Sequence, residues 1–275
     1  MTALDFANVV EIEINSACNF SCSYCPNSVD SRKEKGDMEP ELFYKIIREL
    51  KEINYNGKLA FDFYNEPTLA INFELFVSHA KSELPNVFIE VYSNGTKLNT
   101  LDKIEHIVSL GIDKVIVTKH EEAKNLPFEK LYNDLPLDLK NSFSFRNNED
   151  LILSNRGGSL PKIYDGKTLN APCSIPSLIM TITVEGNVLP CFEDYKQTQE
   201  MGNVKTQTIT EVWQSKKYKK FRSDLLNKNR SYYDICKNCN RISESMKENK
   251  IKTSQGYDEF WKFACERQNV FIKTI

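Results

Sequence analysis

The sequence predicts an α/β fold with a parallel sheet, built as an open sheet or a partial (β/α) barrel and followed by a smaller module. Two observations lead to this prediction. From about residue 10 to residue 145, short apolar segments alternate with longer amphipathic segments, as in repeated strand–helix units. After about Gly166 the pattern changes to a hairpin, which parallel strand–helix repeats do not contain.

The first strand and the first helix enclose a loop that carries cysteines. Residues 10–14 alternate between apolar and acidic side chains, which predicts a strand. The loop that follows ends near Gly36. Pro40 suits the first turn of a helix, and apolar residues recur at helical spacing as far as Ile53. We therefore expect an amphipathic helix directly after the loop.

Further strand–helix units follow along the chain. Their apolar strands predict a parallel sheet with helices outside, and functional groups should then gather at the carboxyl ends of the strands. The expected elements are a strand at Leu59–Tyr64, a helix at Phe73–Leu84, a strand at Val87–Tyr92, a helix at Thr100–Leu110 closed by Gly111, and strands at Lys114–Thr118 and Ser142–Phe145.

The smaller module begins with the predicted hairpin. Residues 179–189 form two apolar segments around a turn at Gly186, which is typical of antiparallel strands. The expected organisation is therefore a partial barrel over residues 1–165, the hairpin module over residues 166–245 and a C-terminal extension over residues 246–275.

A helix is expected after the hairpin. Thr208 and Glu211 have the spacing of a capping box, and apolar residues continue on one side as far as Leu225. The lysine-rich run 216–220 is interpreted as a solvated face and not as a nucleic-acid site. Aromatic residues in the segment 257–271 predict a terminal helix that docks on the body of the protein.

Composition and charge exclude several classes of protein. The 275 residues include 36 Lys+Arg and 38 Asp+Glu, a formal net charge of −2, and 40% are hydrophobic. Such a chain can build a core, but it lacks the excess of basic residues that binding to nucleic acid or an anionic membrane requires. No run of about 18 apolar residues occurs. The acidic N-terminus does not resemble a signal peptide, so we expect a cytoplasmic protein.

Eight cysteines are the unusual feature of this composition. In a reducing compartment, clustered thiols are more often metal ligands or redox centres than cross-links. The cysteines divide into a group of three, a group of four and one alone: Cys18, Cys22 and Cys25; Cys173, Cys191, Cys236 and Cys239; and Cys265.

The first group has the spacing of an incomplete cluster site. Three thiolates on a loop after a strand can hold three corners of a [4Fe–4S] cube and leave the fourth iron open to a substrate or cofactor. A structural zinc site is the alternative, but zinc prefers four ligands, and no histidine lies near Cys18, Cys22 and Cys25.

This loop resembles a known family. Cys18-Asn-Phe-Ser-Cys22-Ser-Tyr-Cys25 resembles the CxxxCxxC loop of radical S-adenosylmethionine (SAM) enzymes, including the aromatic residue before the last cysteine. The resemblance implies a partial barrel of the radical SAM type. It also implies that a cluster held by these cysteines binds SAM, and that reductive cleavage of SAM yields a 5′-deoxyadenosyl radical, which abstracts hydrogen from a C–H bond.

Three strand ends resemble the other motifs of the family. Tyr64–Pro67 resembles its glycine-glycine-glutamate-proline motif, Ser93–Gly95 its ribose-contacting stretch and Val117–His120 its adenine-side strand end. Asn65 stands where the family usually has glycine, so backbone contacts with SAM should differ there. The resemblance implies that the cofactor-binding residues are Tyr24, Tyr64, Asn65, Glu66, Ser93, Asn94, Thr118 and His120.

The second group of cysteines supplies four ligands, which is typical of zinc or an iron–sulfur cluster. Its pattern resembles the C-terminal twitch module of radical SAM enzymes, a relative of the larger SPASM module. The resemblance implies one auxiliary [4Fe–4S] cluster held by Cys173, Cys191, Cys236 and Cys239. A fully ligated cluster suits the role of electron acceptor, which favours an oxidation.

Within the family, the sequence resembles the enzymes that dehydrogenate aminocyclitols. The resemblance lies in residues 11–16, 24–29, 153–158 and 186–194 and extends over about residues 10–240. It implies a secondary alcohol of an aminocyclitol or amino sugar as substrate, a ketone as product, and a place in antibiotic biosynthesis. A flavodoxin or ferredoxin-type protein is the expected electron donor.

The same resemblance places Arg156 and Glu193 in the substrate pocket as the catalytic pair, with Tyr64, Tyr92 and Phe192 around it. A guanidinium and a carboxylate suit a polyhydroxylated ring that bears an amine. Arg156 stays protonated and cannot easily remove the hydroxyl proton. Alternatively, Arg156 anchors a loop by an ion pair and Glu193 belongs to the cluster loop.

Other functions remain open on the sequence. A carbohydrate epimerase would need a hydrogen donor, for which Cys265 is the candidate, although a lone cysteine among aromatic residues is usually a packed apolar group. A peptide-modifying maturase is disfavoured, because about nine residues precede the first strand. A non-enzymatic electron carrier or a zinc-stabilised binding protein is the remaining alternative.

Overall fold

One sheet organises the protein. The computed structural model describes residues 6–32, 35–151, 153–160 and 171–241. Eight strands lie in the order β5-β4-β3-β2-β1-β6-β7-β8. They are β1 Val9–Ile12, β2 Lys58–Phe61, β3 Phe88–Ser93, β4 Lys114–Lys119, β5 Phe143–Asn147, β6 Ile179–Ile182, β7 Asn187–Leu189 and β8 Gly202–Asn203.

The strands from β5 to β6 pair in parallel, and β7 and β8 are antiparallel. Within the described ranges the sheet runs from the edge strand β5 to the edge strand β8 and does not close. The predicted α/β fold with a partial parallel barrel is thereby confirmed.

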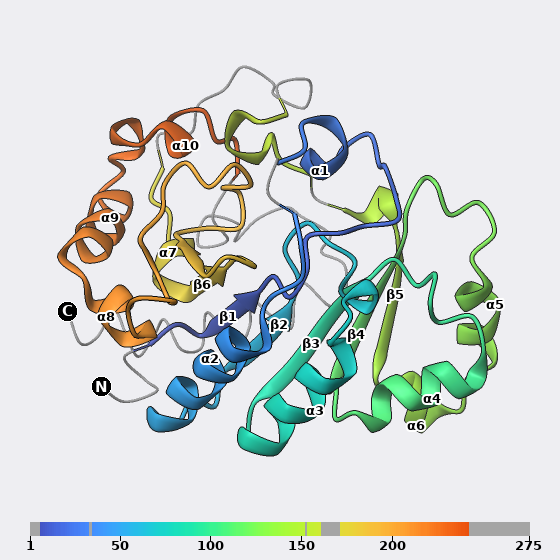
Figure 1. Cartoon of the computed structure of the whole chain (residues 1–275). Coiled ribbons are helices and arrows are strands. Elements are labelled where there is room, and N and C mark those ends of the chain that lie inside the picture. The colour runs from blue at the N-terminus through green and yellow to red at the C-terminus, as the bar shows by residue number, and fades with distance from the viewer. Residues whose placement is uncertain (1–5, 33–34, 152, 161–170, 242–275) are drawn as a thin grey trace.

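Helices lie outside the parallel strands (Figure 1). The longer helices are α2 Pro40–Glu52, α3 Phe73–Glu83, α4 Leu101–Ser109, α5 Pro127–Asp134, α8 Ile209–Gln214 and α9 Lys216–Leu226. The one-turn helices are α1 Pro26–Val29, α6 Leu137–Lys140, α7 Ile175–Leu178 and α10 Asp234–Lys237, and short 3₁₀ turns include η2 Pro67–Leu69 and η4 Arg156–Gly158.

Local sequence explains where these helices begin. Pro40 occupies the first turn of α2, whose apolar side is buried against the sheet, and Phe43 stacks on Phe76 of α3 with ring centroids 4.1 Å apart. The Thr100 side chain accepts a hydrogen bond from the backbone N–H of Lys103 and so caps α4. Both helices confirm the predicted positions to within a few residues.

The hairpin differs from the prediction in one respect. Its strands β6 and β7 are antiparallel as expected, and Gly186 forms the turn with a φ of 80°, where a side chain would be strained. However, β6 also pairs in parallel with β1, so the barrel sheet continues into the hairpin. The division of the chain at residue 165 stays a prediction.

The predicted helix after the hairpin is two helices. Ser215 has an extended backbone conformation between α8 and α9, and its side chain accepts a hydrogen bond from the N–H of Tyr218. The capping box at Thr208 and Glu211 is present. The lysines of the run 216–220 are exposed, which confirms the solvated face.

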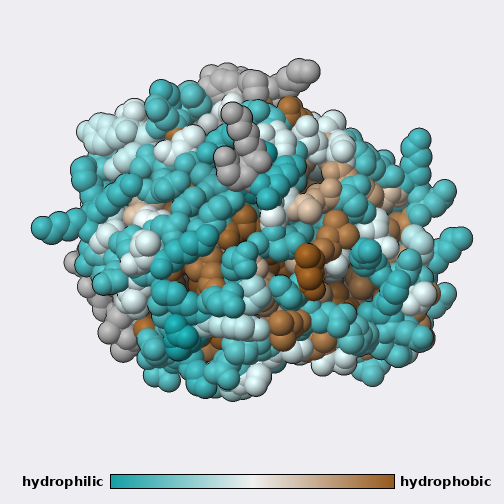
Figure 2. Space-filling model, viewed as in Figure 1, coloured by the Kyte–Doolittle hydropathy of each residue, from teal (hydrophilic) through white to brown (hydrophobic). Residues whose placement is uncertain are grey.

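Figure 2 shows hydrophilic side chains over most of one face, with hydrophobic side chains gathered mainly toward its middle. Among the described residues, no helix is both long and apolar enough to cross a membrane. Cys265 and the predicted terminal helix lie outside the described residues.

Candidate active site

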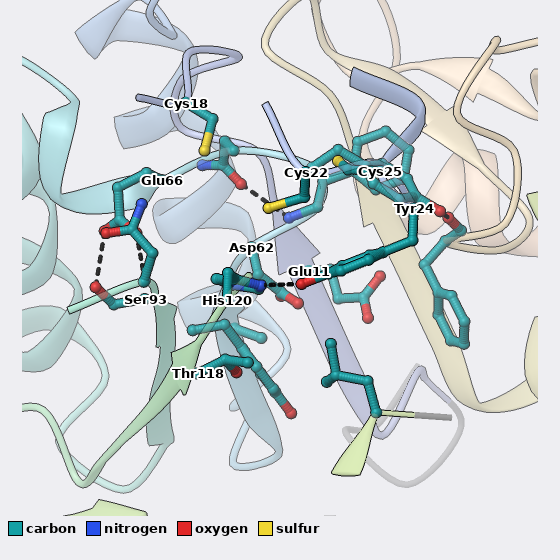
Figure 3. A pocket seen from close by; sticks show the side chains of 18 of the residues that line it. Glu11, Cys18, Cys22, Tyr24, Cys25, Asp62, Glu66, Ser93, Thr118 and His120 are labelled. Carbon is teal, nitrogen blue, oxygen red and sulfur yellow. Dashed lines mark hydrogen bonds between the residues drawn. The ribbon is translucent and has the colours of Figure 1, made fainter. Parts of the chain in front are cut away.

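A cavity of about 280 Å³ opens inside the partial barrel. Residues that point inward from β1 to β6 line it, and the three-cysteine loop forms one edge (Figure 3). Of the predicted site residues, Cys18, Cys22, Cys25, Tyr24, Tyr64, Asn65, Glu66, Tyr92, Ser93, Asn94, Thr118, His120, Arg156 and Phe192 line this cavity. Residues far apart in the sequence therefore meet in one place, at the carboxyl ends of the strands.

The three-cysteine loop is held by two acidic residues after β4. The backbone N–H of Ser21 donates to Glu122 Oε1 at 2.9 Å, and the side chain of Ser23 donates to Glu121 Oε2 at 3.1 Å. Glu121 and Glu122 were not among the residues predicted from the sequence. Their position directly after the predicted adenine-side strand end was the available signal.

Tyr24 and His120 connect the same loop to the end of β4. The Tyr24 hydroxyl lies 2.5 Å from His120 Nδ1. Burial and the nearby guanidinium of Arg146 lower the pKa of His120 to about 4. The imidazole is therefore neutral near pH 7 and can accept the hydroxyl proton of Tyr24 in a hydrogen bond.

Glu66 joins the ends of β2 and β3. Its Oε1 accepts from the hydroxyls of Thr68 at 2.6 Å and Ser93 at 2.8 Å, and its Oε2 accepts from the backbone N–H of Asn94 at 2.6 Å. Burial raises the pKa of Glu66, whereas these hydrogen bonds act in the opposite direction. Figure 3 shows Glu66 and Ser93 joined in this way beside Cys18.

Asn65 and Thr118 also have structural partners. Asn65 Oδ1 accepts from the N–H of Phe63 at 3.0 Å, and its Nδ2 donates to Asn15 Oδ1 at 2.7 Å. This turn occupies the place where glycine is usual in the family. Thr118 Oγ1 accepts from Arg146 Nε at 3.0 Å.

Charged side chains inside the barrel were missed by the sequence analysis. Lys58 Nζ donates to both carboxylate oxygens of Glu90 at 2.9 Å, and Thr181 donates to Glu11 Oε2 at 2.6 Å. Burial raises the pKa of Glu11 to about 7, and burial together with Glu11 and Glu90 raises that of Asp62. Charged residues within the predicted buried strands were the signal for this polar interior.

Four of the predicted substrate residues line the first cavity, and Glu193 lines the second. The Tyr64 hydroxyl donates to the carbonyl of Phe192 at 2.7 Å, and the Arg156 guanidinium lies over the Tyr64 ring, 5.3 Å from its centroid. Arg156 has a φ of 49°. The next position requires glycine, because a side chain at Gly157 would collide with Ile235 of α10. Close packing of this loop on α10 thus orients Arg156. Tyr92 donates to Glu90 Oε1 at 2.9 Å.

Glu193 lies deeper than its predicted partners, with 2% of its side chain exposed. It accepts from the Ser154 hydroxyl at 2.7 Å and 2.8 Å and lies 3.6 Å from Arg156 Nη1 and 3.5 Å from Arg241 Nη1. It lines the second cavity and not the first. The predicted pair of Arg156 and Glu193 therefore exists as an ion pair, in which Arg156 alone faces the first cavity.

The second cavity, of about 20 Å³, is lined by Cys173, Cys191, Cys236 and Cys239 together. Burial raises the pKa of each of these thiols, for Cys239 to about 12. Loading with a metal must therefore displace protons. The N–H groups of Glu193 and Arg241 each point to a cysteine sulfur, Cys191 and Cys239, at 3.4 Å.

Both donor sets fit iron–sulfur clusters. The seven cysteines within the described ranges are free thiols. They line the walls of the two cavities, and no three His, Cys, Asp or Glu side chains among the described residues are placed to hold a single metal ion. Thiolates are the usual ligands of iron–sulfur clusters, and the sulfur-directed N–H groups are of the kind that tune them.

Comparisons with known proteins agree with this geometry. A family profile described as radical SAM superfamily matches residues 12–120, and one described as an iron–sulfur cluster-binding domain, SPASM, matches residues 173–240. The S-adenosyl-L-methionine-dependent 2-deoxy-scyllo-inosamine dehydrogenase of Niallia circulans is 39% identical over 251 residues, which cover 91% of this chain and 97% of that protein. The chain belongs to the radical SAM superfamily.

Solved structures of BtrN match most of the chain. The crystal structure of BtrN in complex with AdoMet and 2-DOIA has a TM-score of 0.82 at 39% identity and covers 91% of this chain and 98% of its own. BtrN in an open conformation has a TM-score of 0.72 at 32% identity and covers 90% of this chain and 99% of its own.

Membership in the radical SAM superfamily confirms several predictions. The chain is a radical SAM oxidoreductase with a SAM-binding cluster and an auxiliary iron–sulfur cluster. The cysteine groups of the two cavities lie in the two matched segments. The roles of the individual SAM-contacting and substrate-contacting residues stay predictions.

Proposed function

We propose that this protein oxidises a secondary alcohol of an aminocyclitol or amino sugar to a ketone, as a step in antibiotic or other secondary-metabolite biosynthesis. The observation that carries the proposal is that one cavity, lined in part by charged side chains, borders the three-cysteine loop and shares a wall residue with the four-cysteine cavity. Arg241 is that residue, since it lines both cavities.

The bound cofactors would supply a 5′-deoxyadenosyl radical for hydrogen abstraction and an auxiliary acceptor for the second electron. The chain itself binds and orients. Glu66, with Ser93 and Asn94, presents a fixed carboxylate next to Cys18, where an ammonium group can be held. The Tyr24–His120 hydrogen bond keeps the cysteine loop against the end of β4.

The polar interior supports a small, hydroxylated, amine-bearing substrate. The cavity presents carboxyl groups at Glu11 and Asp62, whose pKa values are raised by burial, and guanidinium groups at Arg146 and Arg156. Hydrogen-bond donors and acceptors of this kind suit hydroxyl and ammonium groups on a compact ring. The names of the relatives support the same class, because one is a 2-deoxy-scyllo-inosamine dehydrogenase and BtrN was crystallised with 2-DOIA.

Anaerobic turnover with SAM and a panel of aminocyclitols and amino sugars tests the proposal. We expect a product that has lost two hydrogens, formed together with 5′-deoxyadenosine, from at least one amine-bearing cyclitol. An epimerase would give a product of unchanged mass in H2O and a product that carries solvent deuterium in D2O. That outcome, or modification of peptides only, would refute the dehydrogenase.

We also propose a flavodoxin or ferredoxin-type protein as electron donor and a cytoplasmic location. The donor proposal rests on the SAM-binding cluster, which must receive one electron before SAM is cleaved, and the location rests on the many cysteines expected as cluster ligands, because thiols stay reduced in such a compartment. Reduction of the enzyme by purified flavodoxin, followed by 5′-deoxyadenosine formation, tests the donor. Failure with both flavodoxin and ferredoxin, against success with dithionite, would refute it.

A further inference from the structure

The four-cysteine cavity has charged walls as well as thiols. Glu193, Arg230 and Arg241 line it together with Cys173, Cys191, Cys236 and Cys239. Two guanidinium groups therefore stand against one carboxylate around the auxiliary site. An excess of positive charge in a buried site calls for a counter-charge.

Arg230 is the more deeply buried of the two, with 3% exposure. Its Nε donates to the carbonyl of Ala171 at 2.9 Å, and its Nη1 and Nη2 donate to the carbonyl of Arg241 at 3.2 Å and 3.3 Å. Among the residues that the structure describes, no carboxylate lies within ion-pair distance of Arg230. Its hydrogen-bond partners are neutral carbonyls, so an anionic cluster held by the four cysteines would be the counter-charge of Arg230.

Arg230 lines the same small cavity as Cys173, Cys236 and Cys239. A guanidinium in the wall of so small a cavity stabilises negative charge held at the sulfur atoms of these cysteines.

Arg241 faces both cavities. Its guanidinium lies 3.5 Å from Glu193 Oε1 and stacks over the Phe192 ring, 4.9 Å from the centroid. It lines the substrate cavity, where it acts to lower the pKa of Glu11, and it also lines the four-cysteine cavity. One side chain thus connects the place of the substrate with the place of the auxiliary cluster.

We propose that Arg230 and Arg241 raise the reduction potential of the auxiliary cluster, and that Arg241 in addition positions the substrate. A cluster held by four thiolates is anionic and becomes more so when it gains an electron, so nearby cations stabilise the reduced form. The step is a one-electron reduction in which no bond forms or breaks. The electron comes from the substrate radical in turnover and from an added reductant in a titration.

The first test is a redox titration followed by electron paramagnetic resonance. The full chain is reconstituted anaerobically with Cys18, Cys22 and Cys25 replaced by alanine, so that only the auxiliary cluster gives a signal. In this background, Arg230→Gln and Arg241→Gln should each shift the midpoint potential to more negative values. Arg230→Lys keeps the charge, so its midpoint potential should lie close to that of the parent.

Arg222→Gln is the matched control. Arg222 is a guanidinium stacked on Trp213 and Tyr218, at 4.2 Å and 4.5 Å from their centroids, and it lines neither cavity. We expect its midpoint potential to equal that of the parent. Unchanged potentials in Arg230→Gln and Arg241→Gln at parental iron content would overturn the proposal. If Arg230→Gln fails to hold a cluster, Arg230→Lys and Arg241→Gln decide the outcome.

The second test distinguishes the substrate role of Arg241 from the role of Arg230 at the cluster. Only this test rests on the proposed function. With the enzyme that retains all cysteines, Arg241→Gln should raise the KM for the aminocyclitol about tenfold or more, as expected for loss of a charged contact. Arg230→Gln should leave KM within about twofold and lower kcat. A KM of Arg241→Gln equal to that of Arg230→Gln would refute the substrate role of Arg241. The potentials are measured without substrate, so they stand even if the proposed substrate is wrong.

Discussion

At the end of the cavity near Cys18, the side chain of Glu66 has a structural role and a proposed role in binding SAM. Glu66 both ties β2 to β3, through Ser93 and Asn94, and offers a carboxylate next to Cys18. The hydrogen bonds fix its orientation before any ligand arrives, so little rearrangement is needed on binding. The family motif in the sequence pointed to Glu66, but its dual role needed the structure.

Glu66→Gln tests this role. The amide places N–H groups against existing donors and removes the charge, so we expect SAM binding to weaken by about tenfold to a hundredfold, the effect of losing one charged hydrogen bond. Iron content should stay at the wild-type level. Glu74→Gln is the control, because Glu74 is exposed and pairs with His106 on the surface. Equilibrium SAM binding that is equal in wild type and Glu66→Gln would contradict the assignment.

His120 should act as a neutral residue. With its pKa lowered to about 4, almost no imidazolium is present between pH 5.5 and pH 8. The ratio of 5′-deoxyadenosine formation rates between wild type and His120→Gln should therefore be constant across this range. The measurement is the rate at half-unit pH steps under dithionite. A ratio that changes with an inflection near the ordinary histidine pKa of about 6.5 would show that His120 titrates in the active enzyme.

Residues of the polar interior lay beyond the sequence analysis for a physical reason. Alternation assigns Glu11, Lys58 and Glu90 each to one of the two faces of its own strand. It does not say whether that face is turned outward or into a cavity. Only the pairing of β1, β2 and β3 places these three side chains together. Motif residues at strand ends were predictable because their chemistry is local.

At the scale of elements, one serine separates two helices that the sequence predicted as one. The apolar side from Ile209 to Leu225 has helical spacing throughout, and the interruption at Ser215 does not break it. Ser215 ends α8 and caps α9 with its hydroxyl. Periodicity detects a shared buried face, whereas a cap inside that face depends on the backbone of one residue.

Ser215→Ala should destabilise this region. Loss of an N-cap hydrogen bond costs about 0.5–2 kcal/mol, which corresponds to a fall in Tm of roughly 2–4 °C per kcal/mol for a protein of this size. Ser223→Ala, inside α9, is the control and should leave Tm unchanged or higher, since alanine is the better helix former. Thermal unfolding of both reconstituted variants measures the difference. A Tm of Ser215→Ala equal to that of wild type would contradict the capping role.

The strand β6 shows what element prediction could not supply. Its sequence, Ile179–Ile182, correctly indicated one side of a hairpin with β7. Its second partner, β1, lies about 170 residues earlier in the chain, with Val9 paired to Ile179. Local pattern carries no information on such a pairing, which is decided by burial of β6 on both faces.

At the scale of the whole molecule, the two cysteine sites form one functional unit. The segment from Ser154 to Gly158 makes hydrogen bonds to two parts of the auxiliary site. Ser154 donates to Glu193, and Asn155 Nδ2 donates at 2.6 Å to the carbonyl of Asn238, which lies between Cys236 and Cys239. Arg156 leaves this segment toward the substrate cavity. If the proposed function holds, the segments that build the auxiliary site would also position the substrate.

Cys191→Ala should separate the two half-reactions. The variant keeps Cys18, Cys22 and Cys25, so 5′-deoxyadenosine formation should persist at a reduced rate, while ketone formation falls at least a hundredfold. Cys18→Ala should abolish both. Product analysis by mass spectrometry measures the two yields in the same reaction. Full ketone formation by Cys191→Ala would show that the second electron leaves by another route.

The most direct measurement of the central claim uses a substrate labelled with deuterium at the carbon that bears the oxidised hydroxyl. Anaerobic single-turnover reaction of the reconstituted enzyme with SAM and labelled 2-deoxy-scyllo-inosamine should give 5′-deoxyadenosine carrying the label. A ketone without it should form in equal amount. Unlabelled 5′-deoxyadenosine, or labelled 5′-deoxyadenosine with a cyclitol product that has regained hydrogen from solvent, would contradict the account.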